Sequence, residues 1–445
     1  METRGADRLA TKPGSHALAR DERLALEGGS PVRTEPLPSS LHGILEVGEE
    51  EIAAVTEVLR RQKIFRFLLS DEESYAARLE AAYREMTGKP YALAVTGGTT
   101  ALISALVGLG VSTGDEVIVP AYTYIATAAA VLSVGAIPVI AEVDDTLTLD
   151  PEDFRRKITP LTRCVIPVHM RGWPAQMDEI MEIARRHGIL VLEDVAQANG
   201  GSYKGRRLGS IGDAGAFSFQ HYKVITSGEG GMVVTGDEEV YHRATCRHDS
   251  AMRFWRPGEG RPAFAGENAR MCELRAAVGY VQFGRMEGIL ARLRALKARI
   301  VEQIKEAPGI QLHRVADPAG DCGTTLAFFL PDAGQAKRFS RALAAEGIRT
   351  GTIFNKEIPD RHIYCHWDYV LNKWTSDRTG YPWAPQYYKG NVEYSKDMCP
   401  RTLDYLGRVI TIGLGQKWSD SDADDVAAGI LKVAKAYYGN EAVSA

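Results

Sequence analysis

Short apolar runs alternate along the chain with segments whose apolar residues recur every three or four positions. The runs predict buried strands over Tyr91–Thr96, Glu116–Pro120, Ile137–Val143, Cys164–Val168 and Ile189–Leu192. Between these runs, apolar residues at helical spacing predict helices over Thr99–Leu109, Ile125–Val134 and Met177–His187. Strands that alternate with helices indicate βαβ units and a mostly parallel sheet, so we expect an α/β fold. The loops that follow the strands should then gather at one edge of that sheet.

The pattern also divides the chain. Residues 1–40 are rich in charge, Gly, Ala and Pro and have little periodicity, so we expect an N-terminal arm that is flexible or loosely attached. Amphipathic helices then begin near Glu49 and Tyr75 and open a large domain over residues 41–300. Further strand and helix patterns predict a smaller C-terminal α/β domain over residues 301–445, with elements at Thr324–Leu330, Gln335–Glu346, Val409–Ile412 and Ala423–Tyr438.

Two further apolar runs, Gly215–Phe219 and Met232–Val234, enclose a polar turn that carries Lys223. We expect the glycines at 228, 230 and 231 to supply the positive φ angles of a tight reversal. A desolvated lysine in such a turn can lose its proton and attack a carbonyl. Alone, however, a lysine beside a glycine-rich turn is usually a solvated surface residue.

A carboxylate at the end of another predicted strand strengthens the case for a functional lysine. The run Ile189–Leu192 leads into Asp194, and a residue at the carboxyl end of a parallel strand faces the crevice where α/β sheets bind ligands. An acid keeps a pyridinium nitrogen protonated, so Lys223 with Asp194 is the pairing expected for pyridoxal phosphate (PLP).

Two motifs carry a resemblance to a known family. Glu-Asp-x-Ala-Gln spans residues 193–197, and Gly-Asp-x-Gly-Ala-Phe-Ser-Phe-x-x-x-Lys-x-x-x-x-Gly-Glu-Gly-Gly spans residues 212–231. Together they resemble the DegT/DnrJ/StrS-type sugar aminotransferases, which are fold-type-I PLP enzymes. The resemblance extends from about Gly43 to the C-terminus. The layout of the C-terminal part is similar to the 8-amino-3,8-dideoxyoctulosonate transaminase type.

The resemblance implies a set of site residues. Lys223 would hold PLP as an internal aldimine, and Asp194 would pair with the ring nitrogen. Tyr124 would stack on the PLP ring, and Gln197 would contact its phenolic oxygen or lie against the ring. Ser218 would donate a hydrogen bond to the phosphate. The Asn-x-Arg-Met motif that begins at Asn268 would reach the phosphate in a partner subunit, which would make a homodimer with shared active sites obligatory for activity. An N-cap of the long helix that follows is the alternative role of Asn268.

The loop Thr96–Thr100 is a candidate phosphate site on its own chemistry. Glycines allow close approach of an anion, and the N-terminus of the following helix offers unpaired N–H groups, so we place phosphate at Gly98 and Thr99. An N-cap in a tight turn explains the same residues equally well. The loop departs from the family's usual Ser-Gly-Thr, because Gly97 stands in the serine position.

Two features have no settled role. Arg171 stands where the family commonly has a small or aromatic residue, and it is either a binder of a substrate carboxylate or phosphate or a surface arginine. The segment 352–398 is long, irregular and rich in aromatic residues, and we expect it to wall the active site. His169 is interpreted as a structural histidine.

Composition limits the binding partners and the cellular location that we expect for the protein. The formal net charge of −4 over 445 residues disfavours nucleic acid as a partner. No apolar run approaches a membrane span and no secretory signal pattern opens the chain, so a cytoplasmic location without membrane binding is expected. The six cysteines are scattered, which argues against a disulfide framework and against a metal site.

The expected activity is that of a PLP-dependent aminotransferase. By resemblance, it moves an amino group from glutamate or glutamine to a keto-sugar, keto-cyclitol or related carbonyl compound through a pyridoxamine form of the cofactor. The main alternative is a family member that does not transaminate, such as a dehydratase or aromatase of the 3-amino-5-hydroxybenzoate synthase type. A regulator with this fold would need a DNA-binding module, and an NAD-binding protein would need Gly-x-Gly-x-x-Gly after its first strand; the sequence has neither signal.

Overall fold

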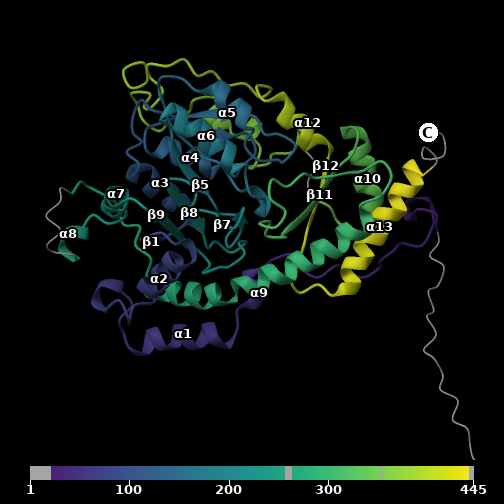
Figure 1. Ribbon diagram of the computed structural model, residues 1–445, viewed down its shortest axis with the longest axis horizontal. Helices are drawn as coiled ribbons and strands as arrows, with labels where there is room; N and C mark the ends of the chain where they lie inside the picture. Colours follow the sequence, from purple (N-terminus) through teal and green to yellow (C-terminus); the bar gives the residue numbers. More distant parts are fainter. Residues whose placement is uncertain (1–21, 256–262, 352–353, 440–445) are drawn as a thin grey trace, which may run out of the picture.

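A seven-stranded sheet organises the larger part of the molecule (Figure 1). The computed structural model describes residues 22–255, 263–351 and 354–439. The strands are arranged in the order β1-β9-β8-β5-β4-β2-β3. In that order, their bounds are Tyr91–Val95, Gly231–Thr235, Ala214–Ser218, Leu190–Asp194, Thr162–Val165, Glu116–Pro120 and Ile137–Ala141.

The sheet is mostly parallel, as predicted. Strands β8, β5, β4, β2 and β3 pair in parallel, and β9 runs antiparallel between β1 and β8. The expected α/β fold class is therefore confirmed. The carboxyl ends of β2, β4, β5 and β8 lie along one edge, which is where the loops with the candidate residues leave the sheet.

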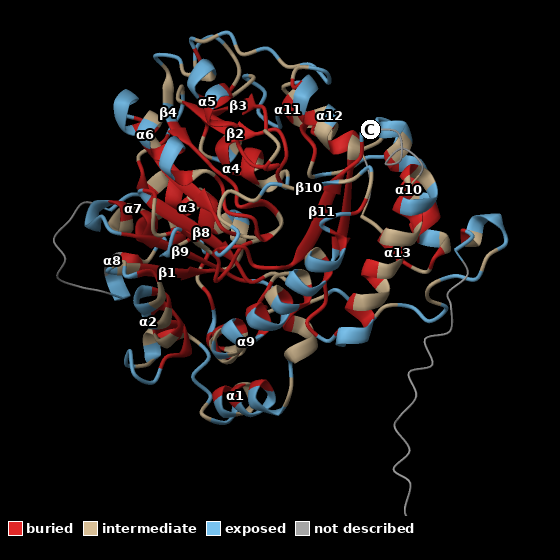
Figure 2. Ribbon diagram, turned by 45° about the vertical axis from the view of Figure 1, so that its right-hand side comes forward, coloured by how far each residue is buried: buried red, intermediate tan, exposed pale blue. Residues whose placement is uncertain are grey.

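Helices cover both faces of this sheet, and its strands are buried along most of their length (Figure 2). One hydrophobic cluster joins the sheet to α3, α4 and α7, which span Gly98–Gly108, Ala126–Ser133 and Glu238–His248. The other cluster joins it to α2, α5, α6 and α9, which span Tyr75–Thr87, Pro151–Lys157, Met177–His187 and Glu273–Ile304. Neighbouring residues such as Val191 and Leu192 belong to opposite clusters, because side chains alternate along a strand.

The long helix α9 links the two parts of the molecule (Figure 1). Near its start it packs on α1 (Glu49–Arg60) and α2, and it also packs on α13 (Asp420–Tyr438). The smaller part has an antiparallel sheet in the order β10-β11-β12. Its elements are β10 Gln311–Leu312, β11 Thr325–Phe329, α10 Ala333–Ala345, α12 Pro400–Arg408 and β12 Val409–Gly413.

The described part of the N-terminal arm is attached to the smaller part. The buried carboxylate of Glu346 accepts hydrogen bonds from the backbone N–H groups of Ala25 (2.8 Å) and Val32 (3.0 Å), and it also pairs with Lys432. Arg33 forms an ion pair with Asp422 at 2.7 Å. Residues 22–40 are thus held by specific contacts rather than loosely, while the expectation of a flexible arm over residues 1–21 lies outside the described residues.

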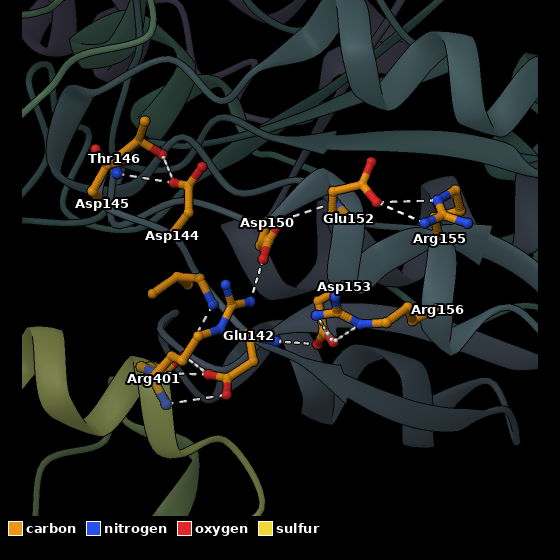
Figure 3. A network of polar contacts seen from close by, with 12 residues as sticks. Glu142, Asp144, Asp145, Thr146, Asp150, Glu152, Asp153, Arg155, Arg156 and Arg401 are labelled. Atoms are coloured by element: carbon orange, nitrogen blue, oxygen red, sulfur yellow. Dashed lines mark hydrogen bonds and ion pairs between the residues drawn. The ribbon is translucent and has the colours of Figure 1, made fainter.

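A polar network fastens α12 to the end of β3 (Figure 3). The buried carboxylate of Glu142 accepts hydrogen bonds from the backbone N–H groups of Arg401 (3.1 Å) and Thr402 (2.8 Å) and from the Thr402 hydroxyl (2.6 Å). Arg401 also forms an ion pair with Asp150 (Figure 3). The smaller part is thereby tied to the sheet that carries the candidate site.

The long aromatic segment crosses back to the large sheet. Ile363 forms an antiparallel bridge with Tyr122, and the Thr123 N–H donates to the His362 carbonyl at 2.9 Å. Short helices lie at Tyr364–His366 and at Asp368–Leu371 (α11). The segment therefore lies directly against the loop that follows β2, while its role as a wall of the active site stays a prediction.

In the described ranges of the chain, no helix combines the length and apolar character that a membrane span requires.

Candidate active site

Asp194 ends strand β5 and is buried at the carboxyl edge of the sheet. Its Oδ1 accepts a hydrogen bond from the Ala196 N–H at 3.0 Å, and its Oδ2 accepts one from the Thr127 hydroxyl at 2.9 Å. Burial raises the pKa of Asp194, while these two hydrogen bonds and the nearby Lys223 oppose the rise. The carboxylate is therefore oriented by fixed donors and placed where a second cation would be stabilised.

Two threonines position this acid, and the sequence analysis did not single them out. Because Thr127 has one hydroxyl hydrogen and donates it to Asp194, its oxygen must accept from the Thr123 hydroxyl at 2.8 Å. Thr127 lies in the first turn of α4, and Thr123 lies in the loop just before that helix. The hydroxyl of Thr127 among the alanines of α4 was the available signal.

Lys223 lies in the turn between β8 and β9, as predicted, and it is partly buried. Burial lowers the pKa of Lys223, whereas Asp194 and Glu229 act to raise it. Lys223 and Asp194 each influence the pKa of the other, so the two groups lie within electrostatic reach, and the strands that lead to them, β8 and β5, are neighbours in the sheet. This geometry is the first requirement of the PLP hypothesis.

Strand register fixes the position of Ser218 relative to Asp194. Asp194 pairs with Ala216 on the neighbouring strand, and Ser218 lies two residues further along. Side chains two residues apart share a face, so Ser218 and Asp194 face the same side. One strand spacing and two residue steps separate their Cα atoms by roughly 8 Å.

The N-terminus of α3 lies against Ser218. A Cβ atom added to Gly98 would be 2.7 Å from the Ser218 Cβ and 2.9 Å from its Oγ, so only glycine permits this approach. Thr99 follows and is exposed, and a Cβ at Gly97 would meet no atom within 4 Å. The unpaired N–H groups of the helix and the serine hydroxyl converge on one small region, which is the chemistry of an anion site.

The turn after β8 uses its glycines differently from the prediction. Only Gly228 has a positive φ, at 78°. A Cβ at Gly230 would be 2.6 Å from the Ser227 Oγ, and one at Gly231 would be 2.5 Å from the Gly97 carbonyl oxygen. The expectation of positive φ at all three glycines was therefore wrong, because two of them are needed for close packing instead.

Tyr124 and Gln197 lie on loops that border this region. The Tyr124 ring is 40% exposed and lies 5.4 Å from the ring of His362, measured between centroids. Gln197 accepts a hydrogen bond from the Arg171 N–H at 3.2 Å and donates one to the Met170 sulfur at 3.3 Å. Both predicted residues thus border the carboxyl edge, and His362 is a neighbour that the sequence alone did not assign to Tyr124.

Asn268 lies further out than the other predicted residues. Its backbone bridges Asp249, and the adjacent Ala269 carbonyl accepts from the Thr96 N–H at 3.0 Å, so this segment follows the end of β1. Helix α9 has Cys272 as its N-cap, so Asn268 does not cap it. The Asn268 side chain is exposed in the single chain.

His169 is a structural residue, as interpreted from the sequence. Its Nδ1 accepts from the Ala175 N–H at 3.0 Å, so its Nε2 carries the proton and donates to Glu193 at 3.1 Å. Three backbone N–H groups of the 209–212 loop also donate to Glu193. The pair is buried and fixes the loop that leads into β8.

Comparison with known proteins assigns the chain to a family. Residues 46–374 match the model of the DegT/DnrJ/EryC1/StrS aminotransferase family. A relative from Streptoalloteichus tenebrarius, described as a putative L-glutamine:3-amino-2,3-dideoxy-scyllo-inosose aminotransferase, is 39% identical over 270 residues. This match covers 58% of the chain and 62% of the relative, so the chain spans less than two thirds of that relative's length.

Solved structures show the same fold. DesV of S. venezuelae, in complex with a ketimine intermediate, has a TM-score of 0.73 and 30% identity, covering 90% of this chain and 99% of DesV. A 3-amino-5-hydroxybenzoic acid synthase has a TM-score of 0.72 and 26% identity, covering 91% of this chain and 99% of the synthase. The predicted fold type is therefore confirmed, and the chain belongs to the DegT/DnrJ/EryC1/StrS aminotransferase family with a fold-type-I architecture.

Proposed function

We propose that this protein is a PLP-dependent aminotransferase that moves an amino group from glutamate or glutamine to a keto-sugar, keto-cyclitol or related carbonyl compound. The observation that carries the proposal is the position of Lys223, in the turn after β8, within electrostatic reach of the buried Asp194 at the end of the neighbouring strand β5. Family membership supports it, because the matched relatives are named aminotransferases.

The donor set fits the proposed cofactor. The α3 N-terminus with Gly98, Thr99 and Ser218 offers N–H and hydroxyl donors that would hold a phosphate, and Asp194 offers a carboxylate that would pair with a ring nitrogen. Lys223 supplies the amine for the aldehyde. When bound, PLP supplies an electron sink for the carbanion that forms on proton removal from an amino acid.

The residues of the chain then have distinct roles. Asp194 would hold a proton on the ring nitrogen, and Thr127 keeps the carboxylate oriented for that contact. Lys223 would take the proton from the α-carbon of the amino donor, and its lowered pKa favours the neutral amine that this role requires. We assign Tyr124 to stack on the ring and Gln197 to contact its phenolic oxygen or its face.

The substrate class follows from the relatives. Several are named as L-glutamine aminotransferases of scyllo-inosose derivatives, and others as sugar transaminases. We therefore infer a keto-cyclitol or keto-sugar acceptor. A reaction of the 3-amino-5-hydroxybenzoate synthase type is the second candidate because one such enzyme is a structural neighbour, but the named relatives favour transamination.

A homodimer with shared active sites belongs to the same proposal. Next to the Asn268 segment, large apolar side chains are exposed, namely Ile64, Leu68, Phe254, Trp255 and Phe264. Phe65 and Phe67 pack on Trp255 at centroid distances of 5.2 and 5.8 Å. Such a patch is typical of a protein interface, and a second copy on it would bring Asn268 toward a neighbouring site. We also place the protein in the cytoplasm, where its six free cysteines would stay reduced.

An absorbance titration tests the proposed reaction. The protein loaded with PLP is titrated with L-glutamate and, separately, with L-glutamine. We expect one of them to convert the band of the lysine-linked cofactor into that of pyridoxamine phosphate. Persistence of the original band with every amino acid tried would contradict transamination and leave the second candidate.

A further inference from the structure

The turn that follows β4 holds Arg171 in an unusual backbone conformation. Arg171 has φ 52° and ψ 26°, in the left-handed region that non-glycine residues seldom adopt. Its N–H donates to the Gln197 side chain at 3.2 Å, and its carbonyl accepts from the Thr324 hydroxyl at 2.6 Å. The turn is therefore fixed between the loop that follows Asp194 and the start of β11, so the direction of the arginine side chain is set by the fold.

The guanidinium is only partly used by the protein. Its Nε donates to the hydroxyl of the buried Tyr122 at 2.6 Å, which aims the planar group. For its two terminal nitrogens, no acceptor within hydrogen-bond distance is found among residues 22–255, 263–351 and 354–439. Burial lowers the pKa of Arg171, but Tyr122 and Asp360 raise it above its ordinary value, so the group stays charged.

The carboxylate that acts on Arg171 electrostatically is engaged elsewhere. Asp360 influences Arg171 electrostatically but forms its hydrogen bonds with His362, at 2.9 Å to both the ring Nδ1 and the backbone N–H. His362 in turn lies against Tyr124. The two terminal nitrogens of Arg171 and the Tyr124 ring, which we propose to stack on the cofactor, therefore lie in the same cluster of loops.

We propose that Arg171 is a specificity residue that binds a carboxylate of one substrate through its two terminal nitrogens. A planar guanidinium with both ends available matches a carboxylate bidentately. One cation with Asp360 nearby suits a singly charged carboxylate better than a diphosphate. The carboxylate comes either from the amino acid donor or from an acidic acceptor. This inference rests on the proposed function, since it concerns the substrates of the same site.

Equilibrium binding tests the assignment without turnover. The probes are 2-methyl-L-glutamate, which has no α-proton to transfer, and D-glucuronate as a sugar acid, each titrated by calorimetry into the cofactor-loaded protein. We expect Arg171→Gln to weaken one of them at least tenfold and Arg171→Lys to retain part of the affinity as a point charge. Loss of amino acid binding identifies the donor site, and loss of sugar acid binding identifies an acidic acceptor.

Two further variants keep the test decisive. Tyr122→Phe removes the hydroxyl that orients the guanidinium, so it should weaken binding of the same probe by a smaller factor. This variant keeps Arg171 and therefore tests the proposal even if Arg171→Gln fails to load cofactor. Arg155→Gln removes an exposed arginine of α5 and should change neither affinity. Equal binding by wild type and Arg171→Gln, or binding of neither probe by wild type, would overturn the proposal. Arg171-dependent binding without amination of the cofactor would instead refute only the proposed reaction.

Discussion

At the scale of single residues, the site is built from groups whose charges are disfavoured by burial. Burial raises the pKa of Asp194 and lowers that of Lys223, and each partly offsets the effect on the other. Such opposed shifts at one edge of a sheet are typical of reactive groups. Because the two pKa values depend on each other, the coupling of Asp194 and Lys223 can be measured through the pH dependence of a reaction of Lys223.

Uptake of PLP by the cofactor-free protein should follow the neutral form of Lys223. Because burial disfavours the ammonium form, the rate of uptake should rise with pH to a midpoint below the ordinary lysine value of 10.5. Asp194→Asn removes the charge that raises this pKa, so its midpoint should lie lower still. Stopped-flow absorbance at a series of pH values measures both midpoints.

The control for that prediction is Glu229→Gln. Glu229 also raises the pKa of Lys223 but is exposed, so its removal should move the midpoint less than removal of Asp194. Equal midpoints in wild type and Asp194→Asn would show that the two groups are not coupled.

At the scale of elements, the N-terminus of α3 is the feature that a single methyl group can test. Gly98→Ala places a Cβ atom 2.7 Å from that of Ser218, so the helix end must move away from the anion site. We expect the Kd for PLP to rise at least tenfold, which corresponds to about 1.4 kcal/mol. Quenching of intrinsic fluorescence on titration with PLP provides the measurement.

Gly97→Ser is the matched control for this helix end. A Cβ there meets no atom within 4 Å, and the φ of −175° suits any residue. Its Kd should stay close to that of wild type. If both variants bound PLP as tightly as wild type, the α3 N-terminus would not be the phosphate site.

The elements themselves were largely predictable because strands and helices leave local patterns. The predicted strand Glu116–Pro120 and helix Met177–His187 coincide with β2 and α6, since each apolar pattern ends where the element ends. Pairings between distant segments leave no such pattern. The bridge between Tyr122 and Ile363 joins residues far apart in sequence and depends on tertiary packing.

Site residues differed in the same way. Lys223 and Asp194 could be predicted because motif and strand-end position coincide, and the structure brings them together. Thr127 could have been inferred as a polar residue in the otherwise apolar first turns of α4, whereas the hydrogen bond from Arg171 to Tyr122 depends on a left-handed backbone that no local pattern signals.

At the scale of the whole molecule, the contacts of Glu142 hold the smaller part against the large sheet. Glu142→Ala would leave two backbone N–H groups and the Thr402 hydroxyl without their acceptor (Figure 3). We expect a loss of about 2–4 kcal/mol in the free energy of unfolding, measured by chemical denaturation. Asp145→Ala, which removes a partly exposed pair with Arg314, should cost less than about 1 kcal/mol. Similar losses in both variants would contradict the role of Glu142.

The proposed homodimer with shared active sites predicts complementation between two inactive variants. In a mixed dimer of Lys223→Ala and Asn268→Ala, one site combines the intact lysine of one subunit with the intact asparagine of the other. Random exchange of subunits should therefore restore about a quarter of the wild-type activity. The assay is transamination after the two variants are mixed at equal concentration. No recovery despite subunit exchange would place Asn268 in its own chain's site or outside any site.

Covalent trapping tests the central claim most directly, because it asks which amine meets the cofactor. The protein loaded with PLP is reduced with borohydride, digested and mapped by mass spectrometry, with Lys223→Arg as the control. The account predicts one added phosphopyridoxyl group, on the peptide that contains Lys223, and none on that peptide in the variant. Labelling of a different lysine, or no labelling of the loaded wild-type protein, would contradict it.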